Sequence, residues 1–114
     1  MRGTAEFQTI GRIGRIAEVG TTLKINIASD YPRKQEDGTW DDNTHWNTAT
    51  VFNERTIKWI KDKCKPGDLV HARGRLRQGS YEKDGETIYT TDLITEDFLL
   101  LAKHQPKSDA NGDA

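Results

Sequence analysis

The segment from Thr21 to Ser29 constrains the fold of this chain more than any other. Its apolar residues Leu23, Ile25 and Ile27 occupy every second position, with polar or small residues between them. This period of two predicts a β-strand with one buried face, because successive side chains of a strand point to opposite faces. The rest of the chain must therefore supply the elements that cover that face.

Similar patterns predict four more strands. The predicted strands run from Phe7 to Gly14, Thr21 to Ser29, His45 to Phe52, Leu69 to about Gln78 and Ile88 to about Leu101. We expect Tyr31-Pro32 to end the second strand and residues 33–43 to form a protruding polar loop, with Asp37-Gly38 as its turn. A second hairpin, from Tyr81 to Thr87, is predicted around Asp84-Gly85.

One short helix is predicted between the third and fourth strands. Asn53 can cap its N-terminus, and from Glu54 to about Cys64 the residues Ile57, Ile60 and Cys64 share one face. Five strands with a helix in this position are the element order of the OB-fold, a five-stranded all-β barrel. In the fourth strand, we expect Val70, Ala72, Gly74 and Leu76 to point inward.

Length and charge narrow the classes of function. A chain of 114 residues accommodates one domain, which we assign to residues 1–103, followed by a disordered polar tail at 104–114. The sequence has no secretory signal and no apolar run of membrane-spanning length, and its single cysteine, Cys64, suits a reducing cytoplasm. The net charge of −1 shows no excess of positive charge, so any phosphate-binding site must come from local clusters.

Several aromatic residues are not needed for a core. Trp46 and Phe52 share a strand face with threonines, while Tyr31, Trp40 and Tyr81 lie in or beside polar loops. Exposed rings suit the stacking of single-stranded bases. Trp59 is different, because it lies in the helix beside Ile60, and we expect it to pack inward; Tyr89 also belongs to the aromatic set.

Cations accompany these rings. Arg73, Arg75 and Arg77 alternate on the outward face of the fourth strand, where they would repel one another unless an anion lies across them. A strand face of this kind is suited to phosphates. The predicted contacts with a nucleic-acid strand are Arg12, Arg15, Tyr31, Arg33, Lys34, Trp40, Trp46, Thr48, Phe52, Arg73, Arg75, Arg77, Tyr81 and Lys83.

Catalytic and metal motifs are weak in this sequence. His45, His71 and His104 lack a second ligand at metal-binding spacing, and there is no phosphate-binding glycine loop followed by Lys-Ser or Lys-Thr. The pairs Asp41-Asp42 and Glu96-Asp97 are adjacent carboxylates, which point to opposite faces of a strand. We therefore predict no catalytic residues, no metal and no cofactor.

Four segments together resemble the single-stranded-DNA-binding proteins of bacteria, the SSB family: FQTIGRIG, THWNTATVF, KPGDLVHARGRL and SYEKDGETIYTTDLI. The resemblance covers Phe7 to about Leu101. It implies an OB-fold that binds single-stranded DNA in replication, recombination or repair and assembles as a homotetramer or homodimer. Trp46 and Phe52 match the family's stacking aromatics, and Tyr31 and Tyr81 fall where the family often has tryptophan.

The chain also departs from that family. Asn47 stands where the family commonly has a histidine associated with subunit contacts, and the outward face of the fourth strand serves subunit association in some relatives, so Arg73 could face a partner subunit. Members of that family usually end in a long flexible tail whose acidic tip recruits other proteins, whereas this sequence has a very short tail that stops at GDA, so we do not expect recruitment through the tail. Two alternatives remain open: an OB-fold accessory protein of primosome or RNA-chaperone type, and a structural subunit whose aromatic face is a protein interface.

Overall fold

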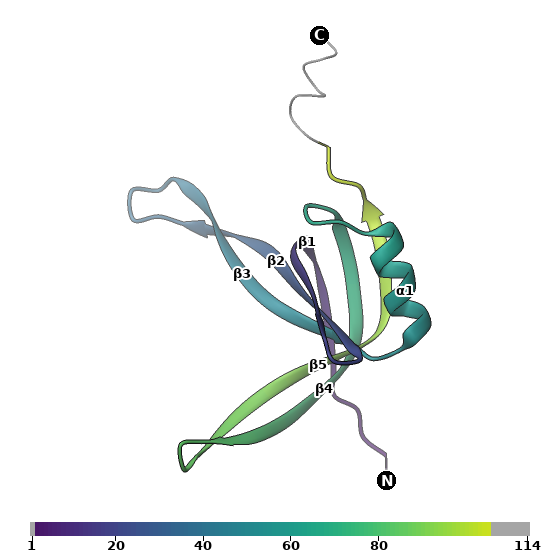
Figure 1. Cartoon of the computed structure of the whole chain (residues 1–114). Coiled ribbons are helices and arrows are strands. Elements are labelled where there is room, and N and C mark those ends of the chain that lie inside the picture. The colour runs from purple at the N-terminus through teal and green to yellow at the C-terminus, as the bar shows by residue number, and fades with distance from the viewer. Residues whose placement is uncertain (1, 106–114) are drawn as a thin grey trace.

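The computed structural model describes residues 2–105, which form five strands and one helix. The elements are β1 (Glu6–Val19), β2 (Thr22–Lys34), β3 (Trp40–Val51), α1 (Glu54–Lys63), β4 (Leu69–Lys83) and β5 (Glu86–Ala102). The strands close into a barrel in the order β1-β2-β3-β5-β4, with β3 and β5 parallel and the other neighbours antiparallel (Figure 1). The predicted five-stranded barrel with its helix between β3 and β4 is confirmed.

The barrel interior holds the core that the sequence pattern predicts. Leu23, Ile25 and Ile27 of β2 are completely buried. The other buried apolar side chains are Ile13, Ala49, Val51, Ile60, Cys64, Val70, Ala72, Ile94 and Phe98. In β2, the residues between the buried ones are only half-buried, so a polar outer face lies directly behind an apolar inner face.

Helix α1 follows its predicted boundaries closely. The Asn53 side chain accepts a hydrogen bond from the backbone N–H of Thr56 at 3.1 Å, which satisfies one of the free donors at the helix start. Ile60 and Cys64 face the core as predicted, and Ile57 packs against it. Trp59 was expected to pack inward, but it is 38% exposed on the side of the helix. The single helix within residues 2–105 is too short and too polar to cross a membrane.

Two hairpins extend beyond the barrel as long two-stranded ribbons, and both project away from α1 in the view of Figure 1. In the first, β2 does not end at Tyr31-Pro32: pairing continues to Lys34 opposite Trp40, so much of the expected 33–43 loop is strand. In the second, β4 and β5 pair as far as Lys83 opposite Glu86, around the predicted Asp84-Gly85 turn. We call these ribbons the β2–β3 arm (residues 30–44) and the β4–β5 arm (residues 76–93).

Leu76 corrects another expectation. Val70, Ala72 and Gly74 point inward as predicted, but Leu76 is 39% exposed. Strand alternation places it on the inner face, yet it lies where the barrel ends: its N–H donates to the carbonyl of Ala5 just before β1, and beyond this residue β4 is paired with β5. An inward position therefore gives burial only as far as the barrel extends.

A buried carboxylate fastens the turn between α1 and β4. Asp68 is 1% exposed, and it accepts hydrogen bonds from the N–H of Lys65 and of His104 and from Nζ of Lys103, at 2.8–2.9 Å. Its backbone carbonyl accepts the N–H of Ile13 at 3.0 Å, which links this turn to β1. His104 is thus attached to the domain, whereas most of the tail predicted to be disordered, residues 106–114, lies outside the described residues.

Candidate nucleic-acid interface

The outer surface of three neighbouring strands gathers aromatic, polar and cationic side chains. The register places Arg12, Ala28 and Trp46 in one row across β1, β2 and β3. We call this surface the platform face; it consists of Arg12, Gly14, Arg15, Lys24, Asn26, Ala28, Trp46, Thr48 and Thr50.

The ring of Trp46 lies across two small residues of this face. Its partner in β2 is Ala28, and its six-membered ring reaches the backbone of Gly14 in β1. A methyl carbon built on Gly14 would lie 2.6 Å from Cη2 of the ring, far inside van der Waals contact. Trp46 is nevertheless 58% exposed, because β1 meets only the Cζ3–Cη2 edge of its ring. The indole thus presents a flat apolar surface to solvent.

A polar row lies beside the ring. Thr48 donates a hydrogen bond to Oδ1 of Asn26 at 2.8 Å, and Nζ of Lys24 donates to Oγ1 of Thr50 at 3.2 Å. These contacts are side chain to side chain across the β2–β3 ladder, so they fix the orientation of the groups without consuming the positive charge of the lysine. Lys24 and Asn26 were not among the predicted contacts, although their alternation with the core residues of β2 already placed them on the outer face.

The cations of the platform face have no acidic partners among the described residues. Arg12 donates to the carbonyl oxygen of Gly67 at 2.9 Å, which holds the guanidinium without neutralising it. Neither Arg15 nor Lys24 forms an ion pair with a carboxylate within residues 2–105. Three cations without acidic partners therefore lie on the same face as the exposed Trp46 ring, and such cations are suited to binding phosphates.

The three arginines of β4 are in a different state. Arg73 pairs with Asp97 and, at 3.7 Å, with Glu6. The other two contacts are Arg75 to Glu96 at 3.1 Å and Arg77 to Asp92 at 3.2 Å. We call Arg73, Arg75 and Arg77 the arginine ladder. The expected mutual repulsion is relieved by anions of the chain itself, the neighbouring carboxylates of β5 and β1. The contact of the ladder with DNA stays a prediction.

The remaining predicted aromatics do not form one continuous surface. Phe52 follows β3 on the same side as Trp46, six residues further on, which is about 20 Å along a strand. Trp40 shares that side but stands at the end of the β2–β3 arm. Tyr31 lies on the opposite side of this arm, edge-on to His45 with ring centroids 5.4 Å apart.

The cations of the arms sit among acidic residues. Arg33 and Lys34 belong to the β2–β3 arm, which carries two basic against five acidic residues between positions 30 and 44. On the β4–β5 arm, Tyr81 and Lys83 share the side of the arginine ladder, while Tyr89 lies on the other side of the ribbon. The arms thus offer exposed rings without an excess of positive charge.

The perturbed pKa values lie away from the platform face. The hydroxyl and N–H of Thr39 lower the pKa of Asp37 in the arm turn, and burial raises the pKa of the Cys64 thiol. Burial also acts to raise the pKa of Asp68, but hydrogen bonds from Lys103 and two backbone N–H groups outweigh it and hold that pKa below its ordinary value. Within residues 2–105 no group of three or more His, Cys, Asp or Glu side chains that could hold a metal ion occurs.

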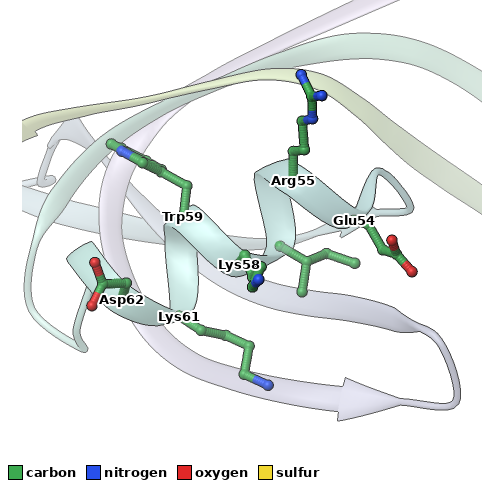
Figure 2. A pocket seen from close by; sticks show the side chains of 7 residues that line it. Glu54, Arg55, Lys58, Trp59, Lys61 and Asp62 are labelled. Carbon is green, nitrogen blue, oxygen red and sulfur yellow. The ribbon is translucent and has the colours of Figure 1, made fainter.

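A surface hollow lies along α1 and offers no comparable site. Its lining includes Glu54, Arg55, Trp59, Lys61 and Asp62. Figure 2 shows Trp59 and Arg55 projecting from one side of the helix and Lys61 from the other, where it pairs with Glu18 at the end of β1. The mixture of both charge signs around one tryptophan gives no field suited to a polyanion.

Comparison with known proteins identifies the family. Residues 6–101 match the single-strand binding protein family, which is most of the described chain. The chain belongs to that family. It is 30% identical to the mitochondrial single-stranded DNA-binding protein Rim1 of Saccharomyces cerevisiae, over 95% of this chain and 80% of the relative. A crystal structure of Rim1 superimposes with a TM-score of 0.70 at 29% identity, covering 90% of this chain and all of that one.

More distant family members share the fold. The single-stranded DNA-binding protein of Rhizobium meliloti is 27% identical over 78% of this chain, and the chain spans only 56% of that protein's length. A Plasmodium falciparum SSB in complex with single-stranded DNA matches with a TM-score of 0.73 at 16% identity, over 89% of this chain and 97% of that one. The barrel is therefore the OB-fold of this family.

Proposed function

We propose that the chain binds single-stranded DNA with little sequence preference, through the platform face, and that it acts as a binding protein and not as an enzyme. The observation that carries this proposal is the exposed Trp46 ring, whose edge meets Gly14 of β1, on a face that also carries cations without acidic partners among the described residues, in a chain of the single-strand binding protein family. Bases of any sequence have a face that can stack on such a ring.

The physical basis of the binding has two parts. Each base stacked on an aromatic side chain contributes about 1–3 kcal/mol, and Trp46 and Phe52 can each take one. Phosphates that contact Arg12, Arg15 and Lys24 release counterions, which makes the affinity fall with salt. Because Trp46 and Phe52 are about 20 Å apart along β3, a bound strand would run along the platform face.

The arms are proposed as secondary contacts. Tyr31, Trp40 and Tyr81 are more than half exposed on ribbons that extend past the barrel, so bases beyond the platform face can reach them. On the arms, Arg33, Lys34 and Lys83 would contact phosphates. The arginine ladder would contribute once phosphates replace the carboxylates that its arginines contact. We expect weaker contributions from these cations, since acidic residues compete for them.

Assembly into a homo-oligomer is proposed as well. One OB-fold covers about 4–16 nucleotides, so a longer strand needs several copies held together. Ile10 and Leu99 are about half exposed on the outer surface of β1, β4 and β5, away from the platform face, and would be covered by a second subunit. Light scattering should give about two or four times 12.9 kDa. A monomer would contradict the proposal and would leave the arginine ladder free for DNA.

The deciding experiment is a titration of the full chain with oligo-dT at several salt concentrations, followed by tryptophan fluorescence. We expect quenching on binding and a log K that falls with log salt by about 0.7 per phosphate contacted. A matched RNA oligonucleotide tests the RNA-chaperone alternative, which predicts equal or tighter RNA binding. Absence of quenching with a flat salt dependence would favour the structural subunit. A cytoplasmic role in protecting exposed strands during replication, recombination or repair is proposed on the same basis.

A further inference from the structure

The β-bulge at Gly14 determines where both the ring and the cations of the platform face lie. The β1–β2 register passes from Ile13 opposite Ile27 to Arg15 opposite Asn26, so Gly14 is an extra residue without a partner in β2. An extra residue of this kind shifts the alternation of the strand by one position. Each side chain that follows Gly14 in β1 therefore points to the opposite face of the sheet from the one it would have in a regular strand.

The shift places two arginines on one side. Arg12 and Arg15 are three residues apart, and in a regular strand side chains at this spacing point to opposite faces. Here Arg12 lies opposite Ala28 and Arg15 opposite Asn26, and both of these are outer positions of β2. The bulge thus brings both arginines to the platform face, one before and one after the position that the Trp46 ring reaches.

The same residue also provides the space for the ring. A Cβ atom on Gly14 would overlap Cζ3 and Cη2 of Trp46, and the φ of Gly14 is not in the left-handed region. Backbone conformation alone therefore does not require glycine at this position. The contact that excludes a side chain is the one with the indole.

We propose that Gly14 is a positioning residue for single-strand binding: the absence of a side chain there leaves room for the Cζ3–Cη2 edge of the Trp46 ring, and its bulge sets Arg12 and Arg15 on the same face as that ring, as one subsite for a base and its flanking phosphates. This inference rests on the proposed function. Gly14 itself contacts no nucleotide, and its contribution passes through Trp46. A substitution at Gly14 must therefore lose its effect when the indole is absent.

The test is a double-mutant cycle with Gly14→Ala and Trp46→Ala, measured by oligo-dT affinity. We expect each single variant to bind at least fivefold more weakly, and Gly14→Ala to change affinity less than twofold in the Trp46→Ala background. Gly79→Ala is the matched control, because a Cβ there meets only the flexible ends of Asp92 and Thr90, at 3.1 Å; its affinity should be unchanged.

A shorter ring gives a second variant in case Gly14→Ala disturbs folding. Phenylalanine at position 46 would not reach as far as Cη2 of the indole, so Gly14→Ala combined with Trp46→Phe should fold and bind like Trp46→Phe alone. Three outcomes would overturn the proposal. Gly14→Ala could reduce the affinity equally in all backgrounds, it could reduce the affinity in none of them, or the combined variant could fail to fold.

A readout without DNA separates this inference from the proposed function. In a chain with Trp40→Phe and Trp59→Phe, Trp46 is the remaining tryptophan, and a ring displaced by a side chain at position 14 loses its contact with β1 and becomes more open to quencher. Gly14→Ala should therefore increase acrylamide quenching in this background, and unchanged quenching contradicts the proposal. If Trp46→Ala leaves DNA affinity intact while the quenching result holds, the positioning stands and the proposed function fails.

Discussion

The platform face and the arginine ladder each present three cations on the outside of the same barrel, but their charges are in different states. Arg12, Arg15 and Lys24 contact neutral oxygens or no partner at all among the described residues. Each arginine of the ladder contacts a carboxylate of a neighbouring strand. A phosphate binds to the first set directly, whereas it must displace an anion from the second. The number of cations alone therefore does not locate a polyanion site; the partners of each cation do.

The largest expected effect concerns the support of the platform face. Asp68→Asn removes the charge that holds Lys103 and the backbone N–H groups of Lys65 and His104, next to the bond from Ile13. Hydrogen bonds to a buried charge are worth about 1.5–3 kcal/mol, and we expect the free energy of unfolding at pH 7 to fall by about 2–3 kcal/mol. Chemical denaturation measures this free energy of unfolding. If it falls by less than about 0.5 kcal/mol, β1 is held in place without the charge of Asp68.

This contribution of Asp68 should depend on pH with a defined sign. Its folded-state pKa is lowered, so the stabilisation is complete above the unfolded value of about 3.9 and disappears as the pH falls through the folded value. The difference in unfolding free energy between the natural chain and Asp68→Asn should therefore shrink in acid. A difference that stays constant from about pH 7 to about pH 2.5 would contradict this assignment.

The second prediction compares two tryptophans. Trp46→Ala should weaken oligo-dT binding by about 1–3 kcal/mol, the range for one stacked base. Trp59→Ala removes an exposed ring of the same size from α1, beside the mixed charges of Figure 2, and should leave the affinity within about 0.5 kcal/mol. Equal reductions in affinity for the two variants would remove the distinction between the platform face and the rest of the surface.

The third prediction uses salt to separate the two cation sets. Arg15→Gln with Lys24→Gln should reduce the slope of log K against log salt by about 0.7 for each phosphate that is no longer neutralised. Arg75→Gln with Arg77→Gln removes the same number of charges from the arginine ladder and should change the slope less, because those charges are already compensated. The reverse order of slopes would place the DNA on β4.

The smallest expected effect is on stability. Arg77→Gln breaks an ion pair with Asp92 at the surface, which is worth about 0–1 kcal/mol and should be weaker at high salt. Arg15→Gln breaks no ion pair within the described residues and should leave thermal unfolding unchanged. If both substitutions shift the melting temperature equally, the ion pair of Arg77 on β4 makes no measurable contribution to stability.

Much of the barrel could be predicted because its signals are local. The alternation of Leu23, Ile25 and Ile27, the Asn53 cap and the Asp84-Gly85 turn each depend on a few neighbouring residues, and the structure has all three. Strand length was not predictable in this way. The arms carry polar residues on both sides, so they lack the pattern of a buried face, while their backbone hydrogen bonds need no such pattern.

The site was only partly predictable, for a related reason. The exposure of Trp46 could be expected from the residues on its own strand, but the carboxylates that neutralise the arginine ladder come from other strands. Which acid meets which arginine depends on the β4–β5 register, including its shift between Arg73 and Gly74. The role of the bulge at Gly14 could not be predicted for the same reason. The glycine indicated a bend in β1, but Trp46, which contacts it, lies two strands away.

The two arms have a consequence for the dynamics of the protein. Residues 30–34 pair only with 40–44, and most of the β4–β5 arm pairs only with itself, so no core covers these ribbons. Isolated two-stranded ribbons are only marginally stable, and their amide hydrogens should exchange with solvent much faster than those of the barrel. Trp40 and Tyr81 are thus carried on supports that open and close locally, whereas Trp46 is carried on a rigid one. A ligand that reaches the arms would lower their exchange rates while those of the barrel change little.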